Sequence, residues 1–138
     1  MKILDKQTDN VLDVLNMILE FTDRRGKVLH NNIVNVKSNN YRPTDLDATA
    51  FADQMAAALS EHLINDRIIL VDSENIKFGP NGSFDATSMD DNNAQYLFEN
   101  DKKMYLKHQM KKIAENQANK KVATMLIERR HTKKSCQV

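Results

Sequence analysis

The most regular pattern along the chain is an apolar stripe near its N-terminus. The stripe advances in alternating steps of four and three residues, which places its members on one face of an α-helix. Thr8 and Asp9 can cap its start, and Gly26 costs only about 1 kcal/mol relative to Ala, so the helix can run to about Val36. The pattern predicts a first segment, residues 1–36, built on one long helix. Its stripe contains Val11, Leu15, Ile18, Thr22, Leu29 and Ile33.

The next segment, residues 37–89, carries no continuous stripe of this kind. Its beginning is rich in turn-forming residues, and Pro43 disfavours helix at the residue before it. Apolar residues then recur at every fourth position and predict one short helix over residues 49–64. The residues at this spacing are Phe51, Met55, Leu59 and Leu63.

Two stretches after the short helix favour extended structure. Residues 67–71 and 76–78 are rich in β-branched and aromatic side chains, which suit strands. Residues 79–82 read Gly-Pro-Asn-Gly, a strong turn signal. We therefore expect an irregular middle segment that carries one short helix and a β-hairpin.

The last long segment, residues 90–130, contains neither Gly nor Pro and predicts a second long helix. Its stripe is imperfect, because Lys111 and Gln117 stand where a strict seam would have apolar residues. The apolar members of this stripe are Leu97, Met104, Met110, Ile113, Ala114, Ala118, Val122, Met125 and Leu126, of which Leu97, Met104, Ile113, Val122 and Met125 are taken as its seam. Residues 131–138 are expected to form a flexible basic tail.

The composition favours a mainly α fold. The 138 residues include only three Gly and two Pro, so long helices meet few obstacles and a strand-rich barrel or sandwich is disfavoured. Without Trp, and with 6% aromatic residues, the chain is not expected to build a large core of its own. We predict that the long N- and C-terminal helices form a coiled-coil-like pair or bundle around the irregular middle segment.

Charge is distributed unevenly along the chain. Residues 1–101 contain 9 Lys and Arg against 17 Asp and Glu, a net charge of 9 − 17 = −8. Residues 102–138 contain 11 against 2, a net charge of 11 − 2 = +9. This polarity suits head-to-tail association, or contact between the basic end and an anionic surface. A solvated basic helix face explains it equally well.

The sequence carries no pattern typical of catalysis or of metal binding. The four His residues are scattered singly, and phosphate-binding and nucleophile motifs are absent, so we expect no enzyme activity and no cofactor. The basic residues lack the framework of a known DNA- or RNA-binding motif. No stretch approaches the roughly 18 apolar residues of a membrane span, and acidic residues interrupt the N-terminal apolar run as they would not in a cleaved signal peptide.

A specific motif follows the first predicted helix. It begins with an N-I-x-N box formed by Asn32, Ile33 and Asn35. After a gap of five residues comes an aromatic residue followed by a basic one, Tyr41 and Arg42, and then an Asp-x-Asp run, Asp45 and Asp47. The motif resembles the N-terminal signature of the bacterial flagellar rod, hook and hook–filament proteins, in which a long helix ends in N-I-A-N followed by T-P-G-Y-K/R. The Asp-x-Asp run is similar to that of the proximal rod proteins within this family.

The residues of the box also have a chemistry of their own. The amides of Asn32 and Asn35 can bond the backbone groups that are freed where a helix ends. Asn40 stands where the family has Gly, and because Asn tolerates the left-handed conformation, we expect such a turn there. Asp45 and Asp47, near a helix start, are expected to cap it and complement its dipole.

The resemblance implies a structural subunit of the proximal rod, located in the periplasmic part of the flagellar basal body and exported without a cleaved signal peptide. Such a subunit would polymerise through its two apolar stripes, which we call the assembly seam. The implied partners are other copies of the chain, other flagellar rod subunits, and a ring or export-gate adaptor at the rod base, with no nucleic acid and no direct membrane insertion. Alternatives are another axial rod or hook component, a helical adaptor, or a basic helical nucleic-acid-binding protein.

Overall fold

The computed structural model describes residues 9–136, which form a mainly helical chain, as the sequence predicts. Its α-helices are α1 (Asn10–Val34), α2 (Ala48–Asn65), α3 (Asn92–Asn100) and α4 (Lys102–Cys136). Two short antiparallel strand pairs join them, β1 (Thr44–Asp45) with β4 (Met89–Asp90) and β2 (Ile76–Phe78) with β3 (Phe84–Ala86). Residues 1–8 and 137–138, parts of the predicted first segment and tail, lie outside the described residues.

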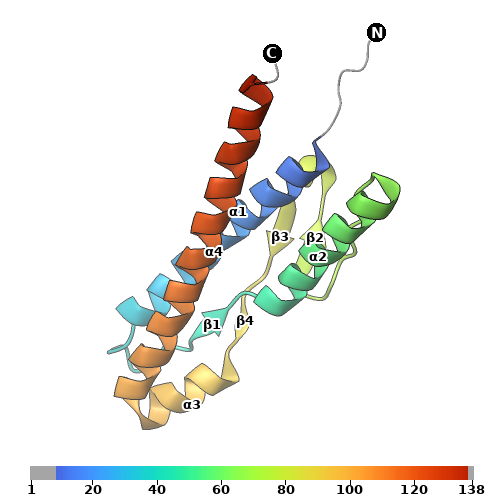
Figure 1. Ribbon diagram of the computed structural model, residues 1–138. Helices are drawn as coiled ribbons and strands as arrows, with labels where there is room; N and C mark the ends of the chain where they lie inside the picture. The colour runs from blue at the N-terminus through green and yellow to red at the C-terminus, as the bar shows by residue number, and fades with distance from the viewer. Residues whose placement is uncertain (1–8, 137–138) are drawn as a thin grey trace.

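Helices α1 and α4 form the predicted pair of long helices and run antiparallel (Figure 1). The side-chain amide of Asn116 donates to the carbonyl of Thr22 at 2.8 Å near the middle of α1. Arg130 binds Asp9 through two hydrogen bonds, of 3.1 and 2.7 Å, at the start of α1. The beginning of α1 and the last turns of α4 therefore lie at the same end of the molecule.

Both ends of α1 are set by polar side chains. The carboxylate of Asp9 accepts a hydrogen bond from the backbone amide of Leu12 at 3.1 Å, which confirms the predicted start. At the other end, the Asn35 side chain donates to the carbonyl of Asn31 at 2.9 Å, one of the last carbonyls of the helix. The helix ends at Val34, close to the predicted limit.

Gly26 lies inside α1, where no special backbone conformation requires a glycine. A Cβ added there would meet Asn116 Nδ2 at 3.5 Å, an ordinary van der Waals contact. Gly26→Ala is therefore expected to raise the free energy of unfolding by about 0.5–1 kcal/mol, measured by urea titration. Gly79→Ala is the control, because its Cβ would meet Ser83 Oγ at 2.6 Å. If Gly79→Ala raised the free energy of unfolding as much as Gly26→Ala, available space at the Cβ position would not explain the effect.

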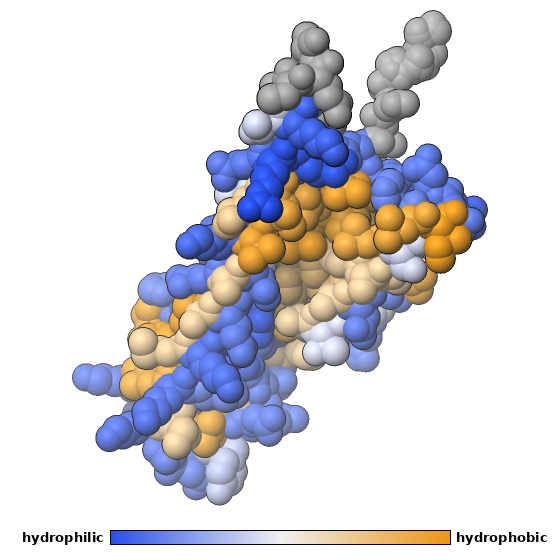
Figure 2. Space-filling model, viewed as in Figure 1, coloured by the Kyte–Doolittle hydropathy of each residue, from blue (hydrophilic) through white to orange (hydrophobic). Residues whose placement is uncertain are grey.

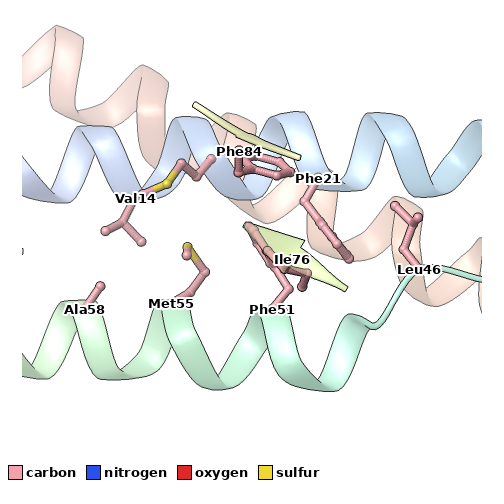
Figure 3. Close-up of a cluster of buried hydrophobic side chains, with 9 residues drawn as sticks. Val14, Phe21, Leu46, Phe51, Met55, Ala58, Ile76 and Phe84 are labelled. Carbon is pink, nitrogen blue, oxygen red and sulfur yellow. The ribbon is translucent and has the colours of Figure 1, made fainter. Parts of the chain in front are cut away.

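The main hydrophobic core lies between α1, α2 and the β2–β3 hairpin (Figure 3). Phe21 of α1 stacks on Phe51 of α2 with ring centroids 4.1 Å apart, and Phe84 of β3 packs against both rings. Nearer the start of α1, Asn10 forms a hydrogen bond with His62 of α2. Helix α2 therefore runs antiparallel to α1, with α4 along another side of α1 (Figure 1).

The middle segment agrees with the sequence in most of its elements. Helix α2 begins one residue before the predicted range 49–64 and ends one residue after it. The strands of the predicted hairpin are joined through a short 3₁₀ helix, η2 (Pro80–Gly82), in which Asn81 and Gly82 both take positive φ. Residues 67–71, in contrast, form no β-strand. The backbone amide of Val71 instead donates to the side chain of Gln54 at 2.9 Å.

The prediction of one continuous helix over residues 90–130 is wrong. The chain leaves helical geometry at Asp101, which has φ −155° and ψ 86° and separates α3 from α4. The Asp101 carboxylate accepts from the backbone amide of Met104 at 3.1 Å, so this residue caps the start of α4. Helix α4 then continues through residues 131–136, where a flexible tail is expected from the sequence, because no Gly or Pro interrupts it.

Candidate functional site

The residues of the motif that begins with the N-I-x-N box lie near the end of α1, and Asn32 is at their centre. Its side chain is fully buried. The amide donates to the carbonyl of Thr44 at 2.8 Å and to Gln109 Oε1 of α4 at 2.9 Å. Its oxygen accepts from the Tyr41 hydroxyl at 2.6 Å and from the Thr44 backbone amide at 3.3 Å. One side chain therefore holds the end of α1, the chain that follows it and α4 together.

Tyr105 completes this junction from α4. Its hydroxyl donates to the backbone carbonyl of Asn32 at 2.8 Å, and burial raises its pKa. Its ring packs edge-on against Phe98 of α3, with centroids 5.1 Å apart. The break at Asp101 makes this contact available, because it lets α3 fold back onto the first turns of α4.

A buried ion network lies next to the junction. Asp45 is 6% exposed and accepts two hydrogen bonds from Arg25 at 2.9 Å and one from Lys112 at 2.9 Å. Lys112 also donates to Asp91 at 2.6 Å. Burial opposes ionisation of Asp45, but the hydrogen bonds from Arg25 and Lys112 outweigh it and hold the Asp45 pKa below its usual value. Two carboxylates and two cations thus connect α1 and α4 with β1 and with the residue that caps α3.

Asp45 therefore does not cap a helix, contrary to the sequence-based expectation. Asp47 does so, because its carboxylate accepts from the backbone amide of Ala50 at the start of α2. Arg42 is exposed and lies 3.5 Å from Asp90. Ile33 is half-buried near the end of α1.

The expected left-handed turn at Asn40 is also wrong. Among the described residues other than glycine, positive φ occurs at Asp66 and Asn81 and not at Asn40. The exit from α1 is instead held by side chains, since Asn35 bonds back to Asn31 and Tyr41 reaches Asn32. Side-chain hydrogen bonds therefore hold this exit, with no left-handed backbone conformation at position 40.

The predicted assembly seam divides into two parts. On α1, Leu15, Thr22 and Leu29 are buried within the chain, while Val11, Ile18 and Ile33 are half-buried. On the C-terminal side, Leu97 and Ile113 are half-buried. Met104, Val122 and Met125 are instead 47%, 55% and 41% exposed, so this part of the seam faces away from α1.

Helix α4 meets α1 through a different face, which sequence reasoning missed. Its most buried residues are Tyr105, Gln109, Asn116 and Ala123. They follow steps of four and seven residues, so they share one side of the helix. Three of the four carry polar groups, and a search for apolar periodicity passes over them. The spacing itself is the signal that could have found them.

An open groove runs between α2 and α4, with α1 as its floor. Its volume is about 420 Å³, and its surface is mostly apolar. The lining includes Leu15 and Ile18 of α1, Ala52 and Leu59 of α2, and Val122 and Leu126 of α4. Figure 2 shows a continuous hydrophobic area at this place between the two outer helices. The groove offers shape and apolar contact, the properties of a docking surface.

Within the described part of the chain, no group of three or more His, Cys, Asp or Glu side chains is arranged to hold a metal ion. No helix in that part is long and apolar enough to cross a bilayer. No protein-family model, curated protein or solved structure matches this chain.

Proposed function

We propose that this protein is a structural subunit of the bacterial flagellar proximal rod. The observation that carries the proposal is the position of the family-motif residues. Asn32 and Tyr41, chosen by sequence resemblance, meet at the end of α1, and Asp45 of the same motif belongs to the buried ion network next to them. Residues brought together in this way have a common task, which is to fix how the chain leaves its first long helix.

The exposed apolar surface of α4 supports an assembly role. Val122, Met125 and Leu126 are between 39% and 55% exposed, and Val122 and Leu126 line the groove described above. A contiguous apolar surface of this kind is typical of a protein that buries it against a partner. The exposed part of the C-terminal stripe supports contact between subunits, while the buried part of the α1 stripe packs within the subunit.

The partners of such a subunit would be other copies of the chain, neighbouring rod subunits, and a ring or export-gate adaptor at the rod base. Its site of action would be the periplasmic rod, and its work would be mechanical and not catalytic. The direct test is to purify basal bodies from the source bacterium and probe them for the chain. We expect it to co-purify with them, and its absence would contradict the proposal.

Val122→Asp tests the surface itself. The side chain is 55% exposed, so the substitution is expected to leave the fold intact, yet it puts a charge into an apolar contact. We expect at least about tenfold fewer assembled basal bodies, counted in electron micrographs, with a corresponding loss of motility. Thr124→Asp is the matched control, because Thr124 is also exposed on α4 but does not line the groove. Normal assembly of Val122→Asp would contradict the role of this face.

A further inference from the structure

Helix α4 has one buried side and one side that is open to solvent. Tyr105 and Gln109 bond to α1, and Phe98 of α3 packs on Tyr105, so both neighbouring helices lie on the buried side. Figure 1 shows the helix along the outside of the molecule. The exposed side carries five basic residues, and we call it the outer face. Its basic residues are Lys103, Lys107, Lys111, Lys121 and Arg129.

Helix geometry brings these five side chains to one side. Residues eighteen positions apart are separated by about five whole turns and therefore point the same way. Lys103 and Lys121 stand in this relation, and so do Lys111 and Arg129. Lys107 lies between the two rows that these pairs define, one step of four residues from Lys103 and from Lys111. The cations of the outer face therefore extend over about 40 Å of the helix.

The charges of the outer face are not used within the chain. Lys112, Lys120 and Arg130, which point toward α1, each form an ion pair with a carboxylate outside α4. Among residues 9–136, in contrast, none of the five basic residues of the outer face takes part in an ion pair or a side-chain hydrogen bond. These five cations remain available to a partner.

Little negative charge stands on the same side of the helix. The acidic residues of α4 are Glu115 and Glu128. Glu115 raises the pKa of Arg25 in α1, so its charge lies toward that helix. Glu128 is the remaining carboxylate among the five cations, which gives the outer face a net charge of 5 − 1 = +4. A long positive surface of this kind attracts a partner that carries many negative charges.

Two exposed methionines indicate what kind of polyanion this is. Met110 is 63% exposed and Met125 is 41% exposed, and both lie among the cations. An anionic bilayer suits both kinds of side chain, because cations reach the lipid phosphates while apolar groups enter the boundary between headgroups and acyl chains. A nucleic acid would use the cations alone, since Tyr105, the aromatic residue of α4 that could stack on a base, is buried.

We propose that the outer face of α4 binds the surface of a bilayer that contains anionic phospholipids. The helix lies along this surface, with its cations at the level of the lipid phosphates and Met110 and Met125 among the headgroups. Binding needs no other subunit. A chain that works outside the rod can therefore bind lipid in this way, and a rod subunit can fail to do so.

Co-sedimentation of the purified full-length chain with vesicles measures the binding. We expect it to sediment with vesicles of phosphatidylcholine and phosphatidylglycerol but not with phosphatidylcholine alone, and added salt should release it. Lys107→Gln combined with Lys111→Gln should weaken the binding at least about tenfold, because each cation near an anionic bilayer contributes to it.

Lys27→Gln combined with Lys77→Gln is the matched control, because it removes the same charge from exposed positions outside α4. It should change the binding less than about twofold. Circular dichroism checks that every variant keeps its fold. Equal weakening by the two double variants, or equal behaviour of the chain with the two kinds of vesicle, would overturn the proposal.

A fluorescent probe tests which face meets the lipid. An environment-sensitive dye is attached to a single cysteine, introduced by Met110→Cys in a chain that also carries Cys136→Ser. Anionic vesicles should shift its emission to the blue, while the same dye at Lys77→Cys should not respond. Response of both dyes would place lipid on other faces as well and overturn the assignment to α4. If the chain binds duplex DNA and its dye at Met110→Cys ignores the vesicles, the partner is a nucleic acid and the proposal is wrong.

Discussion

Replacing Asp45 with Asn should lower the free energy of unfolding by about 3–5 kcal/mol, because it leaves buried cations without their partner. Arg25 donates two hydrogen bonds to the Asp45 carboxylate, and Lys112 would keep only its bond to Asp91. Asn has nearly the same shape as Asp, so the change removes charge and little packing. Urea unfolding followed by circular dichroism measures the loss.

An exposed ion pair provides the control for this substitution. Arg42 and Asp90 lie 3.5 Å apart with side chains 63% and 60% exposed, and such a pair contributes about 0–1 kcal/mol. Asp90→Asn should therefore be almost neutral. Equal effects of Asp45→Asn and Asp90→Asn would show that burial does not strengthen the Asp45 network.

The same network predicts how stability depends on pH. The pKa of Asp45 is lower in the folded chain than its ordinary value, so its contribution is fully present above the unfolded value of about 3.9. The contribution is lost as pH falls through the lower, folded pKa. The difference in unfolding free energy between wild type and Asp45→Asn should therefore be constant near neutral pH and shrink below about pH 4. A constant difference down to pH 2 would refute this explanation.

The second large effect is expected at Asn32. Asn32→Ala removes four hydrogen bonds and strands the side chain of Gln109 inside the molecule, where it already has one unpaired nitrogen. We expect a loss of about 2–4 kcal/mol in unfolding free energy. The loss should be accompanied by a change in tyrosine fluorescence, since the Tyr41 hydroxyl loses its acceptor on the Asn32 side chain.

Asn35, the other asparagine of the N-I-x-N box, provides the control for Asn32→Ala. Asn35 bonds only to groups near the exposed end of α1, which water can replace. Asn35→Ala should therefore cost less than about 1 kcal/mol. If Asn32→Ala and Asn35→Ala lower the free energy of unfolding equally, the stability of the junction does not depend on burial of Asn32.

Apolar spacing predicts the helices that expose one face and bury another. The stripe containing Leu15 and Leu29 gives α1, and the four-residue steps at Phe51 and Met55 give α2. Turn chemistry at residues 79–82 gives the hairpin. These elements follow from local sequence, because the same residues that define the pattern also form the core.

The rest depends on contacts between residues far apart in the chain. Asp101 looks like one more polar residue in a long helix, but its carboxylate caps α4 and the packing of Phe98 on Tyr105 holds α3 against α4. Asp45 looks like a cap until α1 brings Arg25 and α4 brings Lys112 to its two oxygens. The motif contains both Asn32 and Asp45, but only the tertiary structure reveals the buried contacts that each one makes.

The polar contacts between α1 and α4 also decide the alignment of the two helices. Asn32 meets Gln109, the Thr22 carbonyl meets Asn116, and Asp9 meets Arg130. Sliding α4 by one heptad would keep its buried face inward but separate every one of these pairs, and the shorter Asn116 would stand where Gln109 now meets Asn32. Apolar side chains alone would tolerate such a slip far better. The chain therefore gives up some hydrophobic burial and gains a single permitted alignment of its two longest helices.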